Sequence, residues 1–160
     1  MQTNTKRLSM SYSETIIETA LSIDETALLQ MKTHAKQTYP FECCGFMFGK
    51  DGSPRQITSV TEVVNAKEGD QRRRFEIKPT DYMKAEKYAL DNNLDLLGVY
   101  HSHPDNSALP SETDLKMAVP FFSYVIIAVT SETIKDTSSW QLGDQGLFER
   151  ETIEINKTNN

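Results

Sequence analysis

The stretch DLLGVYHSHP, residues 95–104, is an apolar run that ends in two histidines and a proline. Pro104 favours an extended conformation for the residue before it and cannot donate to a β-ladder, so the stretch predicts a central strand that ends at His103. Side chains alternate between the two faces of a strand, so His101 and His103 point the same way. The sequence therefore predicts two neighbouring imidazoles at the carboxyl end of a strand.

The other elements are predicted in an irregular order. Ser22 and Glu25 have capping-box spacing, which predicts a helix that Pro40 ends. Helices are expected over residues 22–39, 80–90 and 111–119, the last with Ser111 at its cap, and strands over 43–49, 56–66, 72–78, 122–129, 138–142 and 147–155. This order lacks the regular alternation of a doubly wound fold, so we expect an α/β protein with a mixed β-sheet packed by two or three helices.

The chain length of 160 residues fits one domain. Residues 1–14 are rich in Ser and Thr and predict a flexible N-terminal arm. A single domain is expected over residues 15–155, followed by a short tail at residues 156–160.

Composition excludes several classes of function. The formal net charge of −6 gives no overall basic surface for nucleic acid or for an anionic membrane. Cys43 and Cys44 are the only cysteines, and because they are adjacent they do not form a disulfide framework. The N-terminal segment lacks the apolar core of a signal peptide, and the longest apolar run, residues 121–129, is far below the roughly 20 residues of a membrane helix. We therefore expect a cytoplasmic protein.

The histidine pair can form part of a metal site. Asp114, in the first turn of the predicted helix after the strand, can supply a third ligand. Two imidazole nitrogens and one carboxylate oxygen suit zinc and leave a fourth position for water, as in catalytic zinc sites. From the residues alone, two other interpretations stay open: the histidines can be ordinary strand residues, and Ser111 with Asp114 can be a helix-capping pair.

The spacing of these residues resembles the signature of the JAMM (MPN-plus) metalloprotease family, which is His-x-His, seven residues, Ser, two residues, Asp. Residues 104–110 are the seven that separate His103 from Ser111. Upstream, YPFECCGFMFG places Glu42 before a predicted strand and resembles the Pro-x-Glu-x-Cys-Gly box of small bacterial members. The resemblance covers about residues 20–151 and implies the JAMM/MPN, cytidine-deaminase-like architecture.

The resemblance implies a role for each residue of the motif. His101, His103 and Asp114 would hold Zn²⁺, which would lower the pKa of its water to near 7 and polarise the substrate carbonyl. Glu42 would act first as general base and then as general acid. Ser111 would donate a hydrogen bond to the developing oxyanion. Because the same hydroxyl is expected to cap a helix, we expect one of its two roles to yield in the transition state.

The resemblance also implies a substrate class. Small bacterial relatives resemble hydrolases that act on the C-terminal tail of ubiquitin-like sulfur-carrier proteins, so a small carrier with a Gly-Gly tail is the expected partner. Such a tail would bind in a narrow groove as an added strand. The carrier, the leaving group (cysteine, lysine or a peptide extension) and the oligomeric state stay open at this point.

The sequence does not fit two other zinc enzyme families. A zinc deaminase needs His-x-Glu and Pro-Cys-x-x-Cys, and a zincin needs His-Glu-x-x-His; the sequence has none of these. A catalytically idle MPN-type binding module remains an alternative, although all five motif residues are present. Cys43 and Cys44 are expected to be apolar filler. Arg72, Arg73 and Arg74 are expected on a solvated strand edge, or else to bind an acidic partner.

Overall fold

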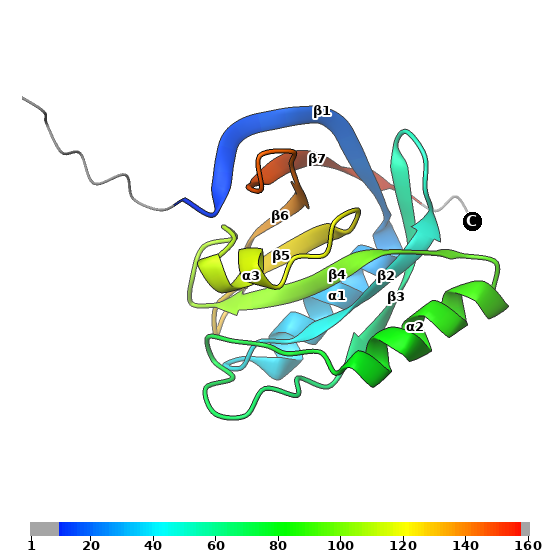
Figure 1. The fold of residues 1–160 in the computed structure, drawn as a ribbon. Coiled ribbons are helices and arrows are strands. Elements are labelled where there is room, and N and C mark those ends of the chain that lie inside the picture. The colour runs from blue at the N-terminus through cyan, green and yellow to red at the C-terminus, as the bar shows by residue number, and fades with distance from the viewer. Residues whose placement is uncertain (1–9, 158–160) are drawn as a thin grey trace, which may run out of the picture.

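The computed structural model describes residues 10–157, in which seven strands form one sheet that closes into a barrel (Figure 1). The elements are, in chain order, β1 (Tyr12–Asp24), α1 (Glu25–Thr38), β2 (Cys44–Lys50), β3 (Arg55–Val63), α2 (Pro79–Asp91), β4 (Asp95–Pro104), α3 (Glu112–Lys116), β5 (Ser123–Val129), β6 (Ile134–Leu142) and β7 (Phe148–Asn156). Within residues 10–157 no helix has both the length and the apolar character needed to cross a membrane.

The sheet is mixed, as predicted. Its strand order is β1-β3-β2-β4-β5-β6-β7, and β1 closes the ring because it pairs in parallel with both β3 and β7. The histidine-bearing strand β4 lies between antiparallel β2 and parallel β5. Two neighbours satisfy its backbone on both sides, so β4 is a rigid support for the side chains at its carboxyl end.

Both faces of the central strands are covered. Helix α1 packs its buried residues, among them Met31, on the face that holds Met47. Helix α2 packs Ala85 and Ala89 on the opposite face, with Phe46. Strand β5 is buried along its whole length for the same reason. Burial on two faces explains why SYVIIAV reads as a continuous apolar run rather than an alternating one.

The first strand was not predicted. The expected helix from Ser22 is wrong at its start, because β1 continues through Asp24 and α1 begins at Glu25. Near this point Leu21, Ser22 and Ile23 pair with both β3 and β7, and these pairings outweigh the local capping pattern. Residues 12–14, placed in the arm by sequence, belong to β1; residues 1–9 and 158–160 lie outside the described part.

The expected strand over residues 72–78 is also wrong. Residues 71–73 form a turn, and residues 74–78 continue without a strand partner. Two smaller differences concern helix α2 and strand β4. Lys78, not Thr80, is the N-cap of α2, with Pro79 in its first turn. Pro104 is the last residue of β4, because its position opposite Val129 in the parallel pair requires no N–H from proline.

Candidate metal centre

His101 and His103 lie on the same face at the end of β4, as the strand period predicts, and both are buried. The carbonyl of Ser107 accepts a hydrogen bond from His103 Nδ1 at 2.8 Å. Because a carbonyl can only accept, Nδ1 carries the proton and the lone pair of Nε2 is left for a metal. The His101 ring stacks on Phe75, with 4.6 Å between ring centroids. The two Nε2 atoms lie 3.1 Å apart.

Asp114 faces the histidine pair from α3. Its Oδ2 atom lies 3.3 Å from Nε2 of His101 and 3.3 Å from Nε2 of His103. The same oxygen accepts the backbone N–H of Ser111 at 2.9 Å. A capping box between Ser111 and Asp114 therefore orients the carboxylate toward the imidazoles.

These three atoms have the spacing of zinc ligands. A tetrahedral ion with ligands at about 2.0–2.1 Å has ligand–ligand edges of about 3.3–3.4 Å. The observed edges of 3.1, 3.3 and 3.3 Å are close to that triangle. His101 Nδ1 is buried and has no hydrogen-bond partner within residues 10–157, so stacking on Phe75 is what holds that ring. Two nitrogens and one oxygen that converge in this way could hold a metal ion.

Glu42 is the fourth titratable group of the cluster and lies between α1 and β2. Its carboxylate and the two histidines place ligand atoms within 4.8 Å of one another. Burial raises the pKa of Glu42 to about 8, and the nearby His103 opposes part of that increase. Two backbone hydrogen bonds fix its position: Glu42 N–H donates to the Gln71 carbonyl at 2.8 Å, and Asn65 Nδ2 donates to the Glu42 carbonyl at 3.2 Å.

The protonation of the three convergent groups follows from their mutual contact. Burial would raise the pKa of Asp114, but the imidazoles of His101 and His103 outweigh it and hold that pKa well below its usual range. Burial lowers the pKa of His101. For His103 the Asp114 carboxylate and the Ser107 carbonyl outweigh burial and raise the pKa. The centre is therefore built around an ionised carboxylate, the charge state that a cation requires.

Ser111 caps α3 through its acceptor capacity. Its Oγ accepts the Asp114 N–H at 3.0 Å. A hydroxyl has one donor and two acceptor lone pairs, so the Ser111 O–H remains available to another partner. Capping uses the acceptor side of the hydroxyl and the expected donation would use its hydrogen, so the cap seen here does not require the other role to yield.

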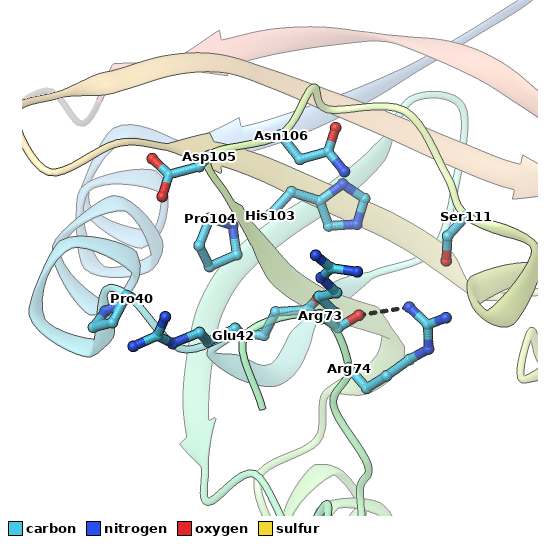
Figure 2. Close-up of a pocket in the computed structure, with 10 residues that line it drawn as sticks. Pro40, Glu42, Arg73, Arg74, His103, Pro104, Asp105, Asn106 and Ser111 are labelled. Carbon is cyan, nitrogen blue, oxygen red and sulfur yellow. Dashed lines mark hydrogen bonds between the residues drawn. The ribbon is translucent and has the colours of Figure 1, made fainter. Parts of the chain in front are cut away.

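A cavity of about 430 Å³ opens beside the cluster and includes Glu42, His103 and Ser111 in its lining (Figure 2). The same cavity is lined by Arg72, Arg73, Arg74, Pro40, Pro104, Asp105 and Asn106. His101 and Asp114 instead line a smaller cavity of about 40 Å³ on the other side of the segment that carries Arg73 and Arg74. The convergent atoms thus lie between two cavities of different size.

Two features of the site were missed by sequence reasoning. Asn65 holds Glu42 and the arginine segment together, yet a single asparagine after a strand gives no recognisable signal. Arg72–Arg74 line the cavity instead of a strand edge, because the segment turns at residues 71–73. The cysteine prediction agrees with the structure, since Cys43 and Cys44 are buried and burial raises the pKa of their thiols to about 11 and about 12.

A sequence profile of prokaryotic homologs of the JAB domain matches residues 24–143. The desampylase of Pyrococcus furiosus is 32% identical over 75 residues, which cover 47% of this chain and 50% of that protein. The alignment therefore spans half of the desampylase. The CysO-cysteine peptidase of Mycobacterium tuberculosis is 28% identical over 120 residues, which cover 74% of this chain and 80% of the peptidase.

Solved structures show the same architecture. A JAB1/MPN domain protein from Archaeoglobus fulgidus superposes with a TM-score of 0.54, covering 86% of this chain and 97% of its own. Its sequence identity is 16%, so this likeness concerns the fold. It agrees with the expected JAMM/MPN arrangement of a mixed sheet with few helices.

Proposed function

The chain belongs to the prokaryotic JAB family, and from that premise we propose that this JAMM-type hydrolase is a zinc-dependent peptidase or isopeptidase. The observation that supports this most is the triangle formed by His101 Nε2, His103 Nε2 and Asp114 Oδ2, with edges of 3.1, 3.3 and 3.3 Å. These three residues would hold the ion. Zinc bound there would supply Lewis-acid chemistry, acidifying water and polarising the carbonyl of the substrate.

Glu42 is proposed to move the proton. Its buried carboxyl, with a pKa raised to about 8, is a stronger base than an exposed glutamate. It accepts the proton of the attacking water and returns that proton to the nitrogen of the leaving group. Its backbone is fixed on both sides by Gln71 and Asn65, so the carboxyl stays beside the cluster throughout.

Ser111 is proposed to stabilise the oxyanion. Its hydroxyl hydrogen is not used in the capping box, and the side chain lines the cavity beside His103. It donates to the substrate carbonyl oxygen as that atom gains negative charge. A fixed donor of this kind stabilises the transition state more than the ground state.

The proposed substrate is the C-terminal tail of a small ubiquitin-like or sulfur-carrier protein that ends in Gly-Gly. The names of two relatives, a desampylase and a CysO-cysteine peptidase, support this class. Glycines have no side chain, so the backbone of a Gly-Gly tail can approach the cluster closely. A catalytically idle MPN-type binding module is the alternative, and the convergence of intact ligand atoms with Glu42 argues against it.

The first test is zinc content, measured by elemental analysis after reconstitution. We expect about one zinc per chain in the wild type and in Glu42→Gln, and much less in His103→Ala. His34→Ala is the matched control, because His34 contacts Tyr100 at 2.8 Å away from the cluster. A wild type that takes up no zinc would contradict the proposal.

Cleavage is tested next on a carrier protein joined through its Gly-Gly tail to cysteine or to a lysine side chain. The zinc-loaded wild type should release the tail, and zinc-loaded Glu42→Gln should not. A zinc-loaded protein that binds the carrier without cleaving either fusion would favour the binding module.

A further inference from the structure

Three consecutive arginines line the larger cavity, and we refer to Arg72, Arg73 and Arg74 as the arginine wall. Figure 2 shows Arg73 and Arg74 directed into the space that His103 and Ser111 face from the other side. Glu42 lines the same cavity. Three positive charges thus stand next to the proposed proton-transfer group in a chain whose formal net charge is −6.

The guanidinium groups of the arginine wall have little neutralisation by acidic side chains. The nearest ion pair joins Arg73 to Asp70 at 4.0 Å, and the side chains are 83% and 58% exposed. Arg72 lies over the Phe41 ring, and Arg74 donates to the Arg73 carbonyl at 2.8 Å. The Arg72 backbone N–H donates to Asp70 Oδ1 at 3.0 Å, but within residues 10–157 the guanidinium groups of Arg72 and Arg74 form no ion pair with a carboxylate.

Few acidic side chains line the same cavity as the arginine wall. Besides Glu42, the one acidic residue that lines the cavity in the described part is Asp105. Its Oδ2 atom accepts a hydrogen bond from the Tyr39 hydroxyl at 2.6 Å. Positive charge therefore exceeds negative charge around the cavity.

The segment that carries the wall is fixed in place. Asn65 Oδ1 accepts the N–H groups of Lys67 and Glu76, at 3.0 and 3.1 Å, and Asn65 Nδ2 donates to the Arg74 carbonyl at 3.1 Å. Gln71 Nε2 donates to the carbonyls of Asn65 and Lys67. Together with the Asn65 Nδ2 bond to the Glu42 carbonyl, these hydrogen bonds hold the backbone of the wall at a set position relative to Glu42.

The position of the wall identifies the part of the substrate it faces. Glu42 returns a proton to the leaving nitrogen, so the leaving group must lie in a cavity that Glu42 lines. The arginine-lined cavity includes Glu42 and is large enough for an amino acid, at about 430 Å³. The smaller cavity, at about 40 Å³, is also lined by Arg73 and Arg74 but does not include Glu42. A further cavity of about 420 Å³ includes Glu42 but neither His103 nor Ser111, so it does not adjoin the proposed metal ligands and oxyanion donor.

From this placement, and resting on the proposed function, we infer that the arginine wall binds a carboxylate carried by the leaving group. Guanidinium groups pair with carboxylates through two parallel hydrogen bonds. The α-carboxylate of a terminal amino acid is two bonds from its nitrogen, and an acidic side chain is a second source of the same group. A lysine side chain within a protein carries no carboxylate near its ε-nitrogen. The wall therefore favours tails joined to the α-amino group of a single terminal amino acid over tails joined to a lysine side chain.

The test compares four leaving groups on one Gly-Gly peptide: alanine, alanine amide, aspartate amide and the ε-amine of a blocked lysine. With zinc-loaded protein we expect kcat/KM for alanine to exceed that for alanine amide about tenfold. Arg73→Gln/Arg74→Gln should bring the ratio of the two rates close to one; the ratio is the readout, because Arg74 lies near Glu42 and its loss can change both rates together. Lys36→Gln/Lys135→Gln removes the same charge at exposed positions of α1 and β6 and should keep the preference. Aspartate amide cleaved as well as alanine would identify a side-chain carboxylate as the source.

Binding to zinc-loaded Glu42→Gln separates this inference from the proposed function. A labelled Gly-Gly-Ala peptide with a free carboxylate should bind several-fold tighter than its amide, and the double arginine variant should abolish that difference. If the carboxylate bound zinc directly, the acid would still bind more tightly than the amide in the double arginine variant. That result would overturn the inference. Equal binding and equal cleavage of acid and amide would also overturn it. Absence of cleavage with the binding difference intact would contradict the proposed function alone.

Discussion

Ser111 combines an observed helix cap with a proposed oxyanion contact in one hydroxyl. Ser111→Ala removes the acceptor that caps α3 and the donor proposed for the oxyanion. We expect kcat to fall about 10²–10³-fold and the free energy of unfolding to fall by about 1 kcal/mol. Zinc content should be unchanged, because the ligand atom belongs to Asp114. Steady-state kinetics, thermal unfolding and elemental analysis together check this.

Ser111→Thr is the matched control, since threonine keeps both the acceptor and the donor. It should retain most of the cap energy and a large part of the activity. If Ser111→Ala lost stability but kept its kcat, the hydroxyl would have a structural role alone.

Glu42 makes the stability of the metal-free protein depend on pH. Its pKa is raised from 4.5 to about 8 in the folded protein, so the folded state binds this proton more tightly than the unfolded state. The resulting stabilisation is complete below pH 4.5 and is lost as pH rises toward 8. Glu42→Gln should therefore match the wild type near pH 5 and exceed it by roughly 2–5 kcal/mol near pH 9.

Chemical denaturation across pH in the presence of a chelator measures this difference. Glu76→Gln, at an exposed position on the neighbouring segment, should show no such pH-dependent gain. A Glu42→Gln curve parallel to the wild-type curve would show that burial of this carboxyl carries no penalty.

At the scale of elements, Asn65 links the end of β3 to the segment that bears the arginine wall. It donates to the Glu42 and Arg74 carbonyls and accepts from Lys67 and Glu76. Asn65→Ala leaves these partners unsatisfied, and we expect a loss of about 1–3 kcal/mol in the free energy of unfolding. Because Glu42 loses an anchor, kcat should fall while zinc content stays at the wild-type level.

Asn92→Ala is the comparison, because Asn92 Nδ2 also donates to a carbonyl, that of Tyr88, at the end of α2 away from the site. It should lower stability without lowering the kcat measured on folded protein. If the two substitutions changed kcat equally, Asn65 would have no specific role in positioning Glu42.

The sequence allowed the convergence of His101, His103 and Asp114 to be predicted more fully than the elements around it. The spacing from His101 to Asp114 lies within one strand, one loop and one helical turn, so strand period and helix capping determine its geometry. Strand β1 was missed because its partners are distant: Tyr12 pairs with Phe148 at the other end of the chain. The turn at residues 71–73 was missed because it depends on hydrogen bonds from Gln71 to Asn65 and Lys67.

At the scale of the whole molecule, the residue before β1 supports the loop that carries Ser111. Ser11 is buried, and its Oγ donates to the Pro110 carbonyl at 2.5 Å. Its own carbonyl accepts the N–H of Phe148 at 3.1 Å. Ser11→Ala leaves the Pro110 carbonyl unsatisfied, so we expect a loss of about 1–2 kcal/mol in stability and a several-fold lower kcat/KM.

Ser13→Ala is the control, because the Ser13 hydroxyl bonds to exposed Thr15 and does not reach the loop. Amide hydrogen exchange near Ser111 should quicken in Ser11→Ala and stay unchanged in Ser13→Ala. Unchanged exchange in both variants would show that the loop does not depend on this contact.

The closure of the barrel by β1 has a consequence for the order of synthesis. Among the strands of the sheet, β1 is synthesised before the others, and β7, with which it pairs along its length, is synthesised after them. A nascent chain can form α1 and the β2–β3 hairpin early, but β1 keeps an unpaired edge until β7 has been synthesised. Because Ser11 bonds to both Pro110 and Phe148, the loop that carries Ser111 gains this support only once β7 has formed, so a chain that stops short of β7 should emerge without an organised candidate metal centre.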